Sequence, residues 1–514
     1  MDGIEDAVTV SRGSGTSKQI RGSSLLLVGR MISLGTNFLV QVLIVRYLQD
    51  KADYGAFAYA LSVVTIATTF VALGTDRAIG RFLPIFQERG RPDAMLGTIV
   101  FVTGTIASLG IALIILVYGL QDLVNGSILN EQAGSLLLIL IVLAPIQALD
   151  DVLMNGFAVF SSPRAIFFRR YVLNPILRLA VVGLLIFGRQ NVDFLAIGYV
   201  ATGAIGVAVY GVLFFRLLRR VGVIPREGRP RFSFPMREIL GFSVPLLTTD
   251  LVYILLNASD VVLLGAITSD AETVADYRVI QPVAALNLIV LQSFTLLFIP
   301  ATARLFARDD REGLRSLYWQ TAAWVAVLSF PIFAMTFALA KPLTVALFED
   351  RYAGSSVFLA IIALGRYYDA ALGFNGLTLR VFGNLKAVVG VNLAAALVNV
   401  VLLLALIPPF GALGAALATG ITLLVFNSLK QLALSRAVGI SVFEPQYLRV
   451  YGTIVASTVV LLVVQAILDP PLIVGLGLVG VASLAVLFAG RHHLQIADTF
   501  PELGRLPFLR RILG

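Results

Sequence analysis

The sequence predicts an all-α, polytopic membrane protein of fourteen transmembrane helices, built from two six-helix repeats and a C-terminal hairpin. Of its 514 residues, 58% are hydrophobic and only 13% are charged, whereas about 25% of the residues of a soluble domain are charged. Long apolar runs recur throughout the sequence. They lack the two-residue alternation of barrel strands, so each indicates a helix. Short sequence matches also recur at an offset of 216 to 223 residues, which indicates an internal repeat.

Six apolar runs make up the predicted N-lobe, residues 23–219, which follows a cytoplasmic tail over residues 1–22. At a rise of 1.5 Å per residue, each run is long enough to cross about 30 Å of hydrocarbon. The predicted spans are 24–45, 54–75, 95–119, 134–160, 165–187 and 194–215. A charged segment follows: residues 216–237 contain seven arginines, which predicts a basic cytoplasmic linker over 220–236.

The second half is predicted to repeat this arrangement as a C-lobe over residues 237–440. Its six spans are 238–266, 277–300, 317–339, 355–379, 387–407 and 412–434. A further hairpin over residues 441–490, with spans near 446–468 and 471–490, adds helices thirteen and fourteen. Residues 491–514 are then expected to form a second cytoplasmic tail.

The internal repeat is inferred from three pairs of short segments that occur in the same order in both halves. The pairs are Ala52-Asp53-Tyr54-Gly55 with Ala275-Asp276-Tyr277-Arg278, Phe160-Ser161-Ser162-Pro163-Arg164-Ala165 with Phe382-Gly383-Asn384-Leu385-Lys386-Ala387, and Tyr199-Val200-Ala201-Thr202-Gly203 with Ala416-Leu417-Ala418-Thr419-Gly420. Because each copy has an even number of helices, both copies are expected to cross the membrane in the same direction.

Charge predicts the orientation in the membrane. The formal net charge is +9, from 39 Lys and Arg against 30 Asp and Glu. With a cytoplasmic N-terminus, 30 of the 39 cations, Arg169 and Lys430 among them, fall in cytoplasmic segments, which is the positive-inside pattern. We therefore expect a multi-pass protein of the cell membrane with both termini in the cytoplasm, no cleaved signal peptide and no nucleic-acid partner. The absence of cysteine and the presence of only two histidines, both near the C-terminus, predict no metal site and no cofactor.

Polar side chains inside predicted spans are the candidate functional residues, because charge in hydrocarbon is costly and usually faces a cavity or a partner. One face of the first helix carries Arg30, Ser33, Asn37 and Gln41, and the corresponding face of the seventh carries Asp250, Tyr253, Asn257 and Asp260. If both faces look across a gap between the lobes, they line a central aqueous cavity. The alternative is structural: Arg30 extends to the inner interface, and Asp250 and Asp260 are neutralised by nearby Arg or Tyr side chains.

Two further arginines lie in the middle of predicted spans. Arg178 of the fifth helix lies at a depth comparable to that of Asp150 and Asp151 of the fourth. In the tenth helix, Arg366 precedes Asp369 by three residues and can pair with it. Both patterns are compatible with an ion pair that only joins helices and with a site for a ligand or an ion.

The segment from Gly74 to Pro84 ends the second span at the predicted cytoplasmic face and contains Arg77 and Arg81. An arginine can donate two parallel hydrogen bonds to a phosphate, so these two are candidates for the place where a phosphorylated substrate enters. The alternative is that they only orient the protein.

Three short segments, the basic linker and the arrangement of the helices as six, six and two carry a family resemblance. The segments are Arg46-Tyr47-Leu48 with Ala52-Asp53-Tyr54-Gly55, Gly74-Thr75-Asp76-Arg77-Ala78, and Asn257-Ala258-Ser259-Asp260-Val261-Val262-Leu263-Leu264-Gly265. The chain resembles, over about residues 20–490, the polysaccharide-biosynthesis (lipid-linked oligosaccharide) flippases of the multidrug/oligosaccharidyl-lipid/polysaccharide exporter superfamily. The resemblance implies two lobes around a central cavity, and movement of a polyprenyl-(pyro)phosphate-linked oligosaccharide to the outer leaflet by alternating access. Asp76, Arg77 and Asp260 fall on motifs of that family.

Such a cargo needs cations for its phosphate and amide or hydroxyl groups for its sugars. The predicted substrate-binding residues are Arg30, Asn37, Gln41, Arg178, Asn257 and Arg366, and the predicted ion-coupling or gating residues are Asp150, Asp151, Asp250 and Asp260. The expected partners are the lipid-linked oligosaccharide, membrane lipids and glycosyltransferases of the same pathway, and we expect a monomer.

Three alternatives remain. A cation-coupled multidrug exporter of the same fold would need an acidic centre in the N-lobe; the first helix has Arg30 there, but Asp150 and Asp151 keep this alternative open. A peptidoglycan-precursor flippase would use the same cations. A glycan polymerase or ligase would need a large external loop with catalytic groups. The predicted external loops are short, so we do not expect an enzyme.

Overall fold

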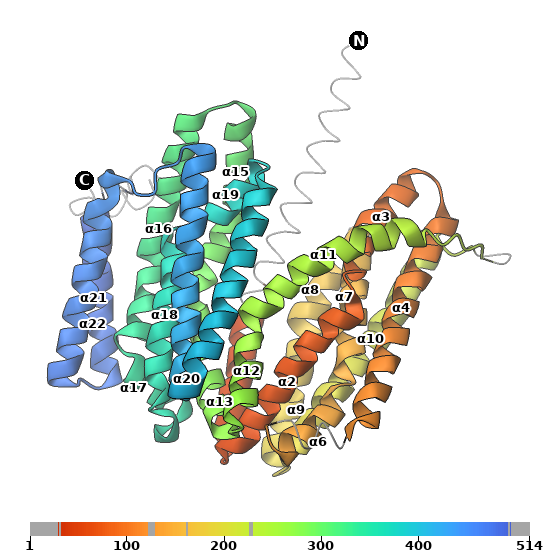
Figure 1. Cartoon of the computed structure of the whole chain (residues 1–514), viewed down its shortest axis with the longest axis horizontal. Helices are drawn as coiled ribbons and strands as arrows, with labels where there is room; N and C mark the ends of the chain where they lie inside the picture. Colours follow the sequence, from red (N-terminus) through yellow and green to blue (C-terminus); the bar gives the residue numbers. More distant parts are fainter. Residues whose placement is uncertain are drawn as a thin grey trace. The chain divides into compact units, whose positions relative to one another are not determined.

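Helices joined by turns and loops make up the described residues, which in this computed structural model are 29, 32–121, 129–160, 163–225, 230–491 and 494, and this part of the chain has no strand (Figure 1). Arg30 lies outside them. Twelve helical segments of the described part are long and apolar enough to cross a membrane. The prediction of an all-α polytopic membrane protein is therefore confirmed.

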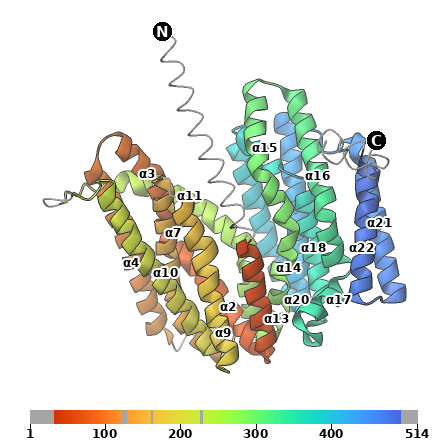
Figure 2. The ribbon, with the colours of Figure 1, turned by 180° about the vertical axis from the view of Figure 1, so that it is seen from behind.

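The helices form two compact units, Met1–Glu272 and Thr273–Gly514, seen from opposite sides in Figures 1 and 2. Unit 1 contains the helix Ile32–Tyr47, α2 (Lys51–Ala72), α3 (Asp76–Glu88), α4 (Pro92–Gly119), α6 (Glu131–Leu140), α7 (Leu143–Val159), α8 (Pro163–Phe167), the π-helical turn η1 (Phe168–Leu173), α9 (Asn174–Phe187), α10 (Val192–Arg220), α11 (Met236–Asn257) and α12 (Ser259–Thr268). After α13 (Ala271–Val279), which crosses the boundary, unit 2 contains α14 (Gln281–Ala285), α15 (Ile289–Ala307), α16 (Arg311–Phe337), α17 (Ala340–Phe348), α18 (Ser355–Ala371), α19 (Asn375–Val381), α20 (Leu385–Val438), α21 (Leu448–Leu468) and α22 (Leu472–Gly490).

The predicted count of fourteen spans stays a prediction for two reasons. The first span is described only as the shorter apolar helix Ile32–Tyr47. The eleventh and twelfth run together as α20, whose 54 residues would extend about 80 Å as one straight helix. Gly411 of α20 has φ 54° and ψ −128°, a conformation that interrupts a helix and suits glycine. Two helices therefore meet at this residue, which lies between the two predicted spans.

The repeat inferred from the sequence has a structural counterpart. Asp53, in the first turn of α2, accepts a hydrogen bond from Gln132 at the start of α6. In unit 2, Asp276 of α13 accepts a hydrogen bond of 3.2 Å from Ser355, the first residue of α18. The partners are 79 residues apart in each unit. Equivalent positions of the two copies thus make the same kind of contact, which supports the internal repeat.

A break between α2 and α3 brings the segment Asp76-Arg77 against α11. α2 ends because Leu73 and Gly74 have left-handed backbone conformations, with φ 50° and 66°. A Cβ atom at Gly74 would also lie 2.8 Å from the carbonyl oxygen of Ser243 in α11. Glycine therefore provides both the conformation and the room that let α11 pack directly on this break.

Candidate functional site

Arg178 of α9 is the centre of a polar group in unit 1, which we call the Arg178 cluster: Arg178, Asn37, Gln41, Tyr54 and Tyr199. The Arg178 Nη1 donates a 3.3 Å hydrogen bond to Asn37 Oδ1, and its Cζ lies 5.3 Å from the centroid of the Tyr199 ring. One turn after Asn37, Gln41 donates a 2.8 Å hydrogen bond to the Tyr54 hydroxyl. Three of the predicted substrate-binding residues, Asn37, Gln41 and Arg178, thus belong to one cluster.

The guanidinium of Arg178 is not neutralised within the part of the chain that the structure describes. It is half-buried, and among the described residues it contacts an amide oxygen and an aromatic ring rather than a carboxylate. A guanidinium has five N–H donors, and the contact with Asn37 uses one of them. Arg178 can therefore donate further hydrogen bonds to an anion, and phosphate accepts such bonds from arginine in pairs.

Asp150 of α7 pairs with a different arginine, Arg169. The Arg169 Nη2 and Nε lie 2.8 and 2.9 Å from the same Asp150 oxygen, and Arg169 Nη1 donates a 2.7 Å hydrogen bond to Asn174. The Arg169 guanidinium also lies 5.5 Å from the centroid of the Tyr210 ring, and the side chain is only 2% exposed. This pair is saturated with contacts, which is the arrangement that makes a buried charge tolerable.

Local sequence explains how a large cation fits between α7, η1 and α10. Pro175 has no N–H to donate to the preceding turn, and the chain forms the π-helical turn η1 immediately before it, with Arg169 as its second residue. On the facing helix, a Cβ atom at Gly206 would lie 2.2 Å from the Arg169 Nη2. Gly206 therefore leaves the space that the guanidinium occupies.

A second ion pair in unit 1 joins α3 to α11. Arg77 Nη2 contacts Asp250 Oδ1, with side chains 46% and 13% exposed. One turn further along α3, the Arg81 guanidinium lies over the Phe242 ring of α11, 4.4 Å from its centroid. Both arginines predicted at the entrance thus hold α11 against α3 (Figure 1).

Two further carboxylates lie near this pair. Asp76 is within electrostatic range of Arg77 and Asp250, and Asp151 of α7 is within range of Asp76. Charged residues of three helices therefore gather where α3, α7 and α11 meet. In the described part of the chain, no group of three or more acidic or histidine side chains could hold a metal ion.

Breaking the Arg77–Asp250 ion pair is expected to change the motion of α11 relative to α3 more than it changes the stability of the protein. Because Arg77 is nearly half exposed, the pair contributes at most about 1 kcal/mol, so Asp250→Asn should lower transport up to about fivefold with little loss of thermal stability. The chain has no cysteine, so cysteines at the exposed positions Gln87 and Glu238 can carry spin labels. We expect the distance distribution between these labels to broaden in Asp250→Asn.

The double variant Arg77→Asp, Asp250→Arg restores opposite charges at the two positions and is the matched control for that experiment. It should recover both the narrow distance distribution and the transport rate. If Asp250→Asn leaves the distribution unchanged, the ion pair does not hold α11, and its assignment as a gating contact is wrong.

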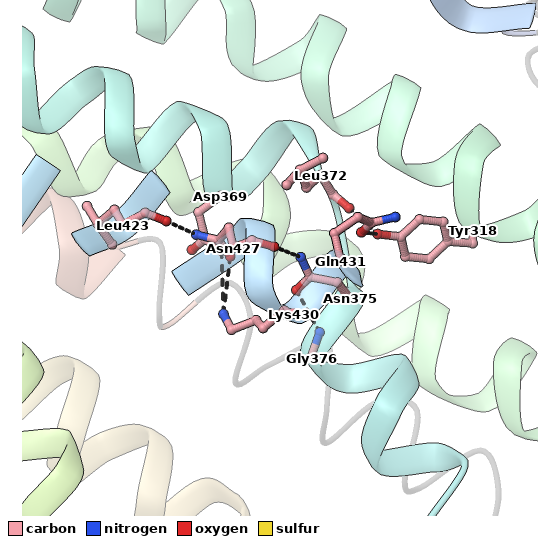
Figure 3. Close-up of polar contacts among 9 residues, drawn as sticks. All are labelled: Tyr318, Asp369, Leu372, Asn375, Gly376, Leu423, Asn427, Lys430 and Gln431. Atoms are coloured by element: carbon pink, nitrogen blue, oxygen red, sulfur yellow. Dashed lines mark hydrogen bonds and ion pairs between the residues drawn. The ribbon is translucent and has the colours of Figure 1, made fainter. Parts of the chain in front are cut away.

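Unit 2 contains a polar group that we call the Lys430 cluster: Lys430, Asp369, Asn375, Asn427 and Gln431 (Figure 3). The sequence pointed to Asp369 but not to its contact with Lys430. Lys430 Nζ lies 3.9 Å from Asp369 Oδ1, donates a 3.2 Å hydrogen bond to Asn427 Oδ1, and lies 3.5 Å from the centroid of the Phe426 ring. The Asn375 amide donates to the Asn427 carbonyl at 3.4 Å, and Gln431 accepts a 2.6 Å hydrogen bond from Tyr318.

The remaining predicted residues lie elsewhere on α11, α12 and α18. Arg366 of α18 is half-buried, and the ion pair of Asp369 is with Lys430 on α20 rather than with Arg366. Asp260 at the start of α12 is buried, and its carboxylate accepts a 2.9 Å hydrogen bond from the N–H of Val261. Asn257 is the last residue of α11, and its side chain lies outside the described part.

Sequence comparison finds relatives for most of the chain. A family model described as "Polysaccharide biosynthesis protein" matches residues 20–306. An uncharacterized membrane protein of Methanocaldococcus jannaschii is 21% identical over 430 residues, which cover 78% of this chain and 81% of that protein.

Solved structures with a similar fold come from two groups of transporters. The lipid II flippase MurJ, in an inward closed conformation, superimposes on this protein with a TM-score of 0.68 at 14% sequence identity. The superposition covers 94% of this chain and 99% of the MurJ chain. An inward-facing multidrug resistance transporter of the MATE family, in the MOP superfamily, gives a TM-score of 0.60 at 15% identity, with 79% and 95% covered. At these identities the likeness shows a shared fold.

Proposed function

The chain belongs to the polysaccharide biosynthesis protein family of flippase-type membrane transporters, and we propose that it moves a polyprenyl-(pyro)phosphate-linked oligosaccharide across the cytoplasmic membrane by alternating access of its two lobes. The family resemblance drawn from the sequence is confirmed by the family match and by the fold of its structural neighbours. The cargo, the direction of movement and the absence of enzymatic activity are parts of the proposal.

The observation that carries this proposal is the unneutralised guanidinium of Arg178. A charge within a membrane span costs about 2.5 to 3.5 kcal/mol, and such side chains normally face a partner or a ligand. Arg178 contacts an amide and a phenol ring instead of a carboxylate. A cationic drug would be repelled there, whereas a phosphate would be attracted and the neighbouring Asn37 and Gln41 amides suit sugar hydroxyls.

The rest of the proposal follows the charge pattern and the repeat. We place both termini in the cytoplasm and assign residues 23–219 and 237–440 to the N-lobe and C-lobe. We assign Arg30, Asn257 and Arg366 to the substrate path together with the Arg178 cluster. Glycosyltransferases that assemble the lipid-linked glycan would supply the substrate on the cytoplasmic side.

Ligand-induced thermal stabilisation of the purified protein tests the class of cargo. A ligand that binds only the folded state raises the melting temperature, and the stabilisation grows with the logarithm of the ratio of ligand concentration to dissociation constant. We expect an upward shift with a polyprenyl-pyrophosphate oligosaccharide and no shift with tetraphenylphosphonium, a cation of the kind that multidrug exporters bind. Lipid II is the third ligand and tests the alternative of a peptidoglycan-precursor flippase.

Each outcome selects one function. Stabilisation by tetraphenylphosphonium alone would replace the proposal with a cation-coupled multidrug exporter. A stronger shift with lipid II than with any other lipid-linked glycan would identify a peptidoglycan-precursor flippase. A glycan that becomes longer or is cleaved during incubation would identify an enzyme.

A further inference from the structure

The two copies of the repeat each hold a carboxylate at a matching position, and each carboxylate pairs with a cation. Asp150 and Asp369 are 219 residues apart, within the offset of the repeat. Asp150 pairs with Arg169 in unit 1, and Asp369 pairs with Lys430 in unit 2. We propose that the Asp369–Lys430 pair is a proton-exchange site, which takes up one proton in each transport cycle and couples transport to a proton gradient.

The two pairs differ in how tightly they are held. In unit 1 two guanidinium nitrogens lie within 2.9 Å of one Asp150 oxygen, and the Arg169 side chain is 2% exposed. In unit 2 the nitrogen and oxygen are 3.9 Å apart, beyond hydrogen-bond distance, and the Lys430 and Asp369 side chains keep 16% and 21% of their surface exposed. The two carboxylates are similarly exposed, at 23% for Asp150 and 21% for Asp369. The pairs differ in the cation, because Arg169 is buried and held at hydrogen-bond distance, whereas Lys430 is more exposed and farther from its carboxylate.

The cations of the two pairs also differ in their ability to release a proton. An arginine keeps its proton under all conditions in a protein, whereas a lysine can release its proton when it is buried. The unit 1 pair therefore has one group that can exchange a proton, and the unit 2 pair has two. Ionisable pairs inside membrane spans are common sites of proton transfer in transporters.

The surroundings of Lys430 leave Asp369 as its one anionic contact among the described residues. Its other direct contacts, the Asn427 oxygen and the Phe426 ring, carry no net charge. Arg380 of α19 is within electrostatic range and repels Lys430. From α16, the Tyr318 hydroxyl is already bonded to Gln431 and to the Leu372 carbonyl, and from α21 the Tyr451 hydroxyl is bonded to the Ala371 carbonyl.

One proton is sufficient to open this pair. A hydronium ion transfers a proton to the Asp369 carboxylate, which becomes a neutral acid, and a water molecule is left. The net charge of the pair rises from zero to +1, and the Lys430 ammonium loses its counter-ion. On the proposed function, a phosphate oxygen of the substrate can then take the place of Asp369, and loss of the proton restores the ion pair and expels the phosphate.

Lysine-selective NMR tests the proton-exchange step without any substrate. The chain has five lysines, Lys18, Lys51, Lys341, Lys386 and Lys430, so protein labelled with ¹³C at the lysine ε-carbons gives five signals. The signal that disappears in Lys430→Arg belongs to Lys430. We expect this signal to shift in one transition as the pH is varied in the wild type, and the transition to be absent or displaced in Asp369→Asn.

Transport in liposomes tests the coupling. Asp369→Asn cannot take up a proton, so we expect the transport driven by a pH gradient to fall about tenfold or more. Asp309→Asn, the same change at a side chain that is 90% exposed, should leave the gradient-driven rate unchanged.

The outcomes of the two measurements separate this proposal from the proposed function. If the Lys430 signal shows no transition in the wild type, or if Asp369→Asn keeps gradient-driven transport, the proton-exchange site is ruled out. If the transition occurs but no lipid-linked glycan moves, the site stands and the proposed cargo fails. Since the NMR titration uses the wild-type protein, misfolding of a variant would not prevent the test.

Discussion

Replacing Arg178 with alanine is expected to raise the dissociation constant for a lipid-linked oligosaccharide at least tenfold while leaving the protein folded. A hydrogen bond to a charged group contributes about 1.5 to 3 kcal/mol, and each 1.4 kcal/mol corresponds to a factor of about ten in affinity. Arg178 forms no ion pair with a carboxylate of the described residues, so its removal leaves no buried carboxylate behind. Binding to the protein in lipid nanodiscs measures the effect.

Two variants make that experiment specific. Arg178→Lys keeps the charge but loses the paired donors, and we expect an intermediate affinity. Arg219→Ala removes another arginine that stacks on a ring, that of Phe215, at the exposed end of α10, and it should bind like the wild type. An Arg178→Ala protein with unchanged affinity would remove the chemical basis of the substrate site.

The second large effect is expected in stability, from Gly206→Ala. The added methyl group would lie 2.2 Å from the Arg169 Nη2, so the guanidinium must move away from Asp150. Overpacking of a buried site costs about 1 to 3 kcal/mol, and the weakened ion pair adds to this cost. The melting temperature of the purified protein should therefore fall by several degrees.

Gly211→Ala is the matched control, because it lies on the same helix and a Cβ atom there would meet nothing within 4 Å. Alanine also has a higher helix propensity than glycine, so this variant should be as stable as the wild type or more stable. Equal melting temperatures for the Gly206→Ala and Gly211→Ala proteins would contradict the packing of Arg169 against α10.

The fold class was predictable because it depends on properties that the sequence displays directly. Apolar runs of membrane-spanning length predict helices whatever their partners are. The offset between Asp53 and Asp276 predicted the repeat, and both residues make equivalent contacts in the structure. The sequence also predicted separate eleventh and twelfth helices, 387–407 and 412–434, and in the structure the helix is interrupted between them at Gly411.

The ion pairs were less predictable because they depend on packing between helices. The charge pattern placed Arg169 and Lys430 among the cytoplasmic cations, although Arg169 is almost fully buried. An arginine near the end of a span can extend to the interface or turn inward, and the choice here depends on the room at Gly206. Likewise, the spacing of Arg366 and Asp369 suits a pair within one helix, but the contact with Lys430 across helices is the one that forms.

Movement of a fluorescent polyprenyl-pyrophosphate oligosaccharide between the leaflets of liposomes tests the central claim most directly. A membrane-impermeant quencher reports the share of the lipid in the outer leaflet over time. We predict that liposomes with the wild-type protein exchange the intact lipid between leaflets, whereas protein-free liposomes and those with Arg178→Ala exchange it at least tenfold more slowly. Equal rates with and without the wild-type protein would contradict the claim that this chain is a flippase for lipid-linked oligosaccharides.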